Sequence, residues 1–165
     1  MKLHFLKKQC IPVFLLLFFS PFYLYAASNC QVQSVGGMTT FDNSGDPHDA
    51  VLADVSGDKT QRRFSLPDRV SAHAKGGGYS ILEMTPVEGE VYSFTYHMEH
   101  TEFYCYVEIT TGCHDFYPSP SYLTYEVTKV EAQGSDTGHH RVCSAAFDYA
   151  GPSTANLIIK MSGNK

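Results

Sequence analysis

The sequence contains no tryptophan, and it also lacks several patterns that identify an enzyme or a metal protein. No Cys-x-x-Cys pair of the kind that holds structural zinc occurs. There is no Gly-x-Ser-x-Gly turn of the kind that exposes a nucleophilic serine in hydrolases. The glycines at 76–78 are not followed by the Lys-Ser/Thr pair of a phosphate-binding loop. No catalytic signature remains, and the lack of tryptophan weakens a role in stacking on sugar rings.

The first 27 residues have the pattern of a secretory signal peptide. Three lysines begin the segment, residues 11–25 are mostly Phe and Leu, and Ala26 and Ala27 end it with small side chains. Two prolines interrupt the apolar run, which is shorter than the about 20 residues of a membrane-spanning helix. We predict cleavage after Ala27, with Ala26 as the alternative, and export to the periplasm or the extracellular space.

The mature chain, residues 28–165, is acidic. It carries nine lysines and arginines against 17 aspartates and glutamates, a net charge of −8. Because binding to nucleic acids and to anionic membranes depends on cationic surface, this charge argues against both as partners. No segment of the mature chain is apolar enough to span a membrane. Its length predicts a single domain with its own core.

Short runs that alternate in polarity at every second residue recur through the mature chain, as in half-buried strands. Turns rich in Gly, Pro, Asn and Asp separate them roughly every 8–12 residues, and no window has the 3.6-residue period of an amphipathic helix. This pattern predicts an all-β fold of about 8–10 short strands, an antiparallel β-sandwich of jelly-roll type. A small β-barrel is the alternative. The predicted core consists of Val51, Val55, Ile81, Phe94, Tyr96, Phe103, Val107, Ile109, Val127, Phe147, Leu157 and Ile159.

The most informative stretch is a pair of alternating runs on either side of residue 100. A loop with an even number of residues, 99–102, sets Tyr96 beside Cys105 and makes one face of the hairpin apolar. An odd loop would mix polar and apolar side chains, since a slip of one residue turns every side chain to the other face. The even loop leaves an opposite, outward face that carries Ser93, Thr95, His97, Tyr104, Tyr106 and Glu108.

Two tyrosines among small polar and charged groups on an outward face are typical of surfaces that stack on a sugar or anchor a protein. We predict that Thr95, His97, Tyr104, Tyr106 and Glu108 bind an unknown protein or carbohydrate ligand. The protein is then an exported, non-catalytic binding module without a cofactor. A small hydrolase with an unfamiliar site is an alternative. Tyrosine is also common in half-buried strands, so a second sheet or loop over these rings is the competing interpretation.

Three histidines offer a second hypothesis, a periplasmic or secreted copper- or zinc-binding protein. His97 and His100 flank the tip of the predicted hairpin, and His114 follows it along the chain. Imidazole nitrogens, together with the Met98 thioether, are donors that copper accepts, and imidazole also suits zinc. The spacing matches no known metal motif, so histidines on surface loops are the competing interpretation.

Four cysteines remain in the mature chain: Cys30, Cys105, Cys113 and Cys143. An even number in an exported protein predicts two disulfides, and four cysteines allow three pairings. We favour Cys105–Cys113, which closes a short loop, and Cys30–Cys143, which ties the N-terminus to a late strand. Each bond would stabilise the domain by about 2–4 kcal/mol.

Overall fold

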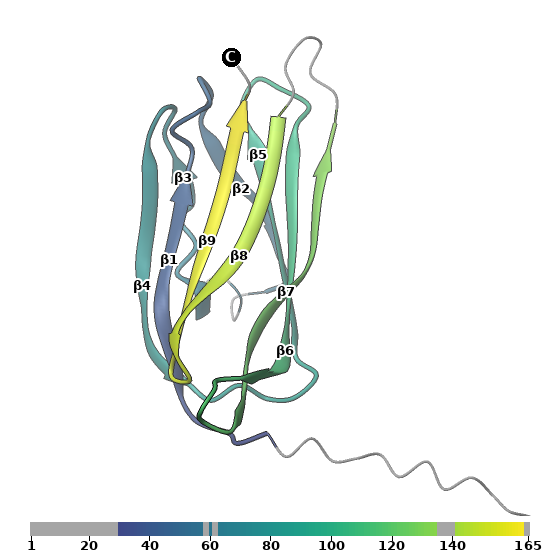
Figure 1. The fold of residues 1–165 in the computed structure, drawn as a ribbon. Helices are drawn as coiled ribbons and strands as arrows, with labels where there is room; N and C mark the ends of the chain where they lie inside the picture. Colours follow the sequence, from purple (N-terminus) through teal and green to yellow (C-terminus); the bar gives the residue numbers. More distant parts are fainter. Residues whose placement is uncertain (1–29, 58–59, 61–62, 135–140, 164–165) are drawn as a thin grey trace, which may run out of the picture.

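The computed structural model describes residues 30–57, 60, 63–134 and 141–163, without the side chains of residues 79–84 and 163 (Figure 1). The predicted signal peptide, residues 1–27, lies outside this part. The described residues form two β-sheets that lie face to face. The five-stranded sheet has the order β3-β2-β5-β6-β7, and the four-stranded sheet has the order β4-β1-β9-β8. The predicted all-β sandwich is confirmed, and the barrel alternative is wrong.

The strands of the five-stranded sheet are β2 (Ala50–Val55), β3 (Arg69–Val70), β5 (Val91–Met98), β6 (Tyr104–Asp115) and β7 (Ser121–Gln133). Those of the four-stranded sheet are β1 (Val35–Asp42), β4 (Lys75–Met84), β8 (Arg141–Gly151) and β9 (Thr154–Gly163). Pairs of these strands are antiparallel except β1 and β9, which run parallel with Thr39 beside Leu157. More than 100 residues separate that pair in the chain, so no turn signal predicts it.

The register of the β5–β6 hairpin confirms the even loop. Tyr96 pairs with Cys105, and His97 pairs with Tyr104. The inward side chains of both strands are buried in the core between the sheets, and Tyr96 and Cys105 have no exposed area. The alternation of the two runs therefore determines which side chains enter the core, because a strand side chain has only two faces to occupy.

Most of the predicted core is confirmed. Seven members are buried: Phe94, Tyr96, Phe103, Val107, Ile109, Leu157 and Ile159. Three more are partly buried against them: Val55, Val127 and Phe147. The side chain of Ile81 lies outside the described part.

Val51 is the exception in the core, because β2 does not alternate as expected. A bulge lies between Leu52 and Asp54, where β2 pairs with β5. An extra residue in one strand reverses the alternation beyond it. Leu52 and Val55 consequently pack on the core, whereas Val51 lies beside His97 and is only partly buried.

The two predicted disulfide pairings are wrong. The structure joins Cys30 to Cys113 and Cys105 to Cys143. Cys105 and Cys113 both lie on β6, which runs without a break to Asp115. Eight residues of extended strand separate them by about 26 Å, too far for one bond. Cys105 instead faces the core and meets Cys143 of β8, so this disulfide links the two sheets.

Candidate functional site

The five residues predicted to bind ligand lie together on the face of β5 and β6 that points away from the four-stranded sheet. We call this the outer face, and it extends onto β7. The register places the outward residues in three rows across the sheet: His97, Tyr104 and Gln133; Thr95, Tyr106 and Glu131; Ser93, Glu108 and Lys129. Directly opposite residues in a sheet are close enough to interact, so each row is a continuous strip of side chains.

The first row contains a stacked pair of rings. The rings of His97 and Tyr104 are nearly parallel, with centroids 4.5 Å apart and an angle of 22° between their planes. His97 Nε2 lies 2.8 Å from the carbonyl oxygen of Thr101. A carbonyl only accepts, so Nε2 carries the proton and donates it. The hairpin loop thus orients His97, and His97 supports Tyr104, whose side chain stays 39% exposed.

Tyr106 in the second row is held by charged neighbours. Its hydroxyl donates to Glu108 Oε2 at 3.1 Å, and Thr128 Oγ1 donates to the other carboxylate oxygen at 3.2 Å. Lys129 Nζ lies 5.6 Å from the centroid of the Tyr106 ring and 2.9 Å from Glu131. The Glu131 hydrogen bond raises the pKa of Lys129, and the same bond lowers the pKa of Glu131. The pair is therefore fully ionised near neutral pH.

These contacts bear on the alternative that a second layer covers the tyrosines. The four-stranded sheet packs on the opposite face, where the inward residues of β5 and β6 are buried. Among the described residues, the ring, hydrogen-bond and cation–π contacts of the His97, Tyr104 and Tyr106 side chains are with β5, β6, β7 and the hairpin loop. In the described part, the contacts that hold these three rings thus come from their own sheet and its hairpin loop.

The structure does not form the predicted three-histidine metal site. His114 lies near the far end of β6, and the ten residues from Tyr104 span about 33 Å of strand. There it stacks on Tyr149 with ring centroids 4.4 Å apart. Met98 is fully buried in the core and is not available as a ligand. Within the described residues, no three His, Cys, Asp or Glu side chains are grouped as a metal site requires.

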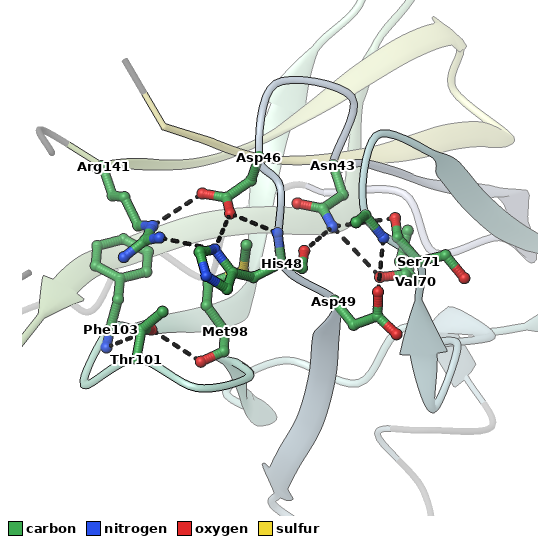
Figure 2. A network of polar contacts seen from close by, with 11 residues as sticks. Asn43, Asp46, His48, Asp49, Val70, Ser71, Met98, Thr101, Phe103 and Arg141 are labelled. Atoms are coloured by element: carbon green, nitrogen blue, oxygen red, sulfur yellow. Dashed lines mark hydrogen bonds and ion pairs between the residues drawn. The ribbon is translucent and has the colours of Figure 1, made fainter. Parts of the chain in front are cut away.

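A second polar cluster, which the sequence did not reveal, lies at the end of the sandwich near the β5–β6 hairpin (Figure 2). Arg141 Nε donates to Asp46 Oδ2 at 2.8 Å, and the two side chains are 3% and 1% exposed. His48 Nδ1 lies 3.0 Å from both Asp46 Oδ1 and Arg141 Nη2. The guanidinium also lies 6.0 Å from the centroid of the Phe103 ring.

Burial and hydrogen bonding act in opposite directions on Asp46. Burial by itself raises the pKa of this carboxyl. Hydrogen bonds from Arg141, and from the backbone N–H and ring of His48, outweigh burial and hold the pKa below its ordinary value. The carboxylate is therefore charged and paired, and it ties the loop after β1 to the first residue of β8.

The same cluster supports the outer face. Asn43 Nδ2 donates to the backbone carbonyls of His48 at 2.8 Å and Ser71 at 3.1 Å, which joins the loop after β1 to the loop after β3 (Figure 2). The backbone N–H of Glu99, in the hairpin loop, donates to the carbonyl of Asp49 at 2.9 Å. These bonds fix the end of the hairpin that carries His97 and Tyr104. In the sequence, this loop reads only as a turn rich in Asp, Asn, Gly and Pro.

One small cavity lies between the sheets in the described part, lined by residues that include Gly37, Arg63, Tyr125 and Leu157. Its volume is about 20 Å³, which is room for one water molecule. Sites for organic ligands are usually larger by more than tenfold. The cavity therefore does not suit an organic substrate, and the outer face remains the candidate site.

The described residues include no helix with the length and apolar character needed to cross a membrane. No protein-family model matches the chain, and no curated protein is recognisably similar to it.

Proposed function

We propose that this protein is an exported, disulfide-stabilised binding module that holds a protein or carbohydrate ligand on its outer face. The observation that carries the proposal is the exposed Tyr104 ring, stacked on His97 and next to Tyr106 on one sheet. Aromatic side chains of this kind are the usual anchors of binding surfaces. The two disulfides fit the oxidising environment outside the cytoplasm.

The rigidity of the site supports this function. Stacking on His97 holds Tyr104, and the bond to Glu108 holds Tyr106. Side chains that are already ordered lose little conformational freedom on binding, so more of the contact energy appears as affinity. The strands beneath them are cross-linked to the other sheet through Cys105. The site therefore presents a preformed surface rather than a loop that orders around its ligand.

The test compares the ligands retained by the wild type and by the Tyr104→Ala, Tyr106→Ala double variant on arrays of immobilised glycans and peptides. We expect the affinity of the double variant for these ligands to fall by at least about 30-fold, because truncating an aromatic anchor costs about 2 kcal/mol or more of binding free energy. Tyr117→Ala is the control, since Tyr117 is 98% exposed in the β6–β7 loop, outside this face. Retention of every ligand by the double variant would refute the site.

A further inference from the structure

The outer face carries more carboxylates than cations. Asp54 of β2 pairs with Thr95, so it stands on this face with Glu108 and Glu131. At the β3 edge, Arg69 is neutralised by Asp49 at 2.7 Å and by Glu99. Lys129 is engaged with Glu131. Among the described residues, these ion pairs leave the carboxylates of Asp54 and Glu108 without a cation of their own, which makes this part of the face negative at neutral pH.

The face already shows how it accommodates a cation. The Lys129 ammonium lies over the Tyr106 ring while Glu131 holds it from the side. A ring face attracts a cation within about 6 Å of its centroid, and a nearby carboxylate adds direct charge pairing. This arrangement of one ring and one carboxylate around one cation is built entirely from residues of β6 and β7.

Tyr104 also presents a ring face, but no lysine or arginine of the described residues lies over it. Its neighbours in the row are His97 and Gln133, and Gln133 Nε2 donates to Glu131 Oε2 at 3.2 Å. The Glu131 carboxylate thus lies between the two tyrosine rows. An incoming cation over the exposed Tyr104 ring would meet a carboxylate on the adjoining row, as Lys129 does over Tyr106.

We infer that the ligand of the outer face is a cationic segment of a protein partner, whose arginines lie against the exposed Tyr104 ring beside Glu131 and pair with Glu108. The inference rests on the proposed function and names the class of its ligand. Arginine fits because its planar guanidinium both stacks on a ring and binds a carboxylate with two hydrogen bonds. The net charge of −8 on the mature chain also attracts such a segment at long range.

The experiment measures fluorescence anisotropy of a labelled peptide of alternating arginine and serine, and of the same peptide with citrulline in place of arginine. Citrulline keeps the shape of arginine and removes its charge. We expect wild-type protein to bind the arginine peptide at least about tenfold more tightly, with the difference shrinking as salt is raised. Equal affinity for the two peptides would overturn the inference.

Two pairs of substitutions separate a built site from general attraction between opposite charges. Glu108→Gln with Glu131→Gln removes two negative charges from the outer face. Glu88→Gln with Asp148→Asn removes two exposed carboxylates elsewhere and changes the net charge equally. We expect the affinity for the arginine peptide to fall about tenfold in Glu108→Gln, Glu131→Gln and less than about twofold in Glu88→Gln, Asp148→Asn. Equal losses in the two pairs would overturn the inference.

The two proposals fail in different ways. Loss of array ligands in the Tyr104→Ala, Tyr106→Ala variant, with no preference for arginine over citrulline, would leave the proposed function standing and remove its cationic ligand. Arginine-peptide binding that is unchanged in this double variant would show that the peptide lies elsewhere on the protein and would also remove the inference. Thermal unfolding of each variant confirms that the fold is intact before binding is compared.

Discussion

Replacing Arg141 by methionine tests how much the buried ion pair at the end of the sandwich contributes to stability. The substitution keeps an apolar chain of similar length against Phe103 and removes the guanidinium. The Asp46 carboxylate, only 1% exposed, then loses its charged partner and keeps its bonds to His48. Removing one member of a buried pair leaves an uncompensated charge and costs about 3–5 kcal/mol. We therefore expect the free energy of unfolding of Arg141→Met to fall by this amount at pH 7.

The effect depends on pH in a defined direction. The pKa of Asp46 is lowered in the folded protein, so its contribution is present above the unfolded pKa of about 4. That contribution is lost as the pH falls through the lower, folded value. In Arg141→Met the carboxyl has lost its strongest hydrogen-bond donor, and its pKa rises. The stability difference between wild type and variant should consequently shrink below pH about 4.

Urea unfolding followed by circular dichroism at neutral and acidic pH measures the loss of unfolding free energy and its dependence on pH. The matched control is Lys75→Met, which breaks the exposed ion pair of Lys75 with Asp42 at 3.0 Å. An exposed pair contributes about 0–1 kcal/mol, so this control should change little. The double variant Asp46→Asn, Arg141→Met removes both charges and should recover part of the loss. A loss in Arg141→Met no larger than in Lys75→Met, or one independent of pH, would refute the reasoning.

Three further predictions concern the frame of the sandwich. Gly37→Ala should lower the free energy of unfolding by about 1–3 kcal/mol, because the added Cβ would overlap the backbone of β9. Gly36→Ala is the control, since there is open space around Gly36; equal melting temperatures of the two variants would contradict the prediction. Replacing Cys105 and Cys143 together by alanine should cost about 4 kcal/mol, from the 38-residue separation that their bond closes; an unchanged urea midpoint would argue against it. Burial raises the pKa of Tyr149 to about 12, so stability present below pH about 10 should decline above it. Because burial also raises the pKa of Tyr92, Tyr96 and Tyr125, the late phenolate step in ultraviolet titration should be smaller by one tyrosine in Tyr149→Phe than in the wild type; a late step of unchanged size would contradict this.

The local pattern of the chain predicted the architecture and the composition of the outer face. Alternation with a period of two places Tyr96 inside and Tyr104 outside whatever the partner strands are, because successive side chains of a strand point to opposite faces. The length of the 99–102 loop then set the register of the hairpin. Both features follow from neighbours in the sequence, so they could be derived without the fold. The binding role of the face remains a prediction.

Contacts between distant parts of the chain decided what the pattern could not. The sequence holds no signal that β1 and β9 run parallel, that Cys105 meets Cys143, or that Asp46 lies beside Arg141, 95 residues away. Each of these contacts depends on how the two sheets pack against each other. The sequence by itself offers many other residues that would serve equally well as partners. The three-histidine site does not form for a different reason: β6 runs on to Asp115, and the length of this strand carries His114 away from the hairpin tip. A period along the chain assigns a side chain to a face, and only the packing of the sheets assigns its partner.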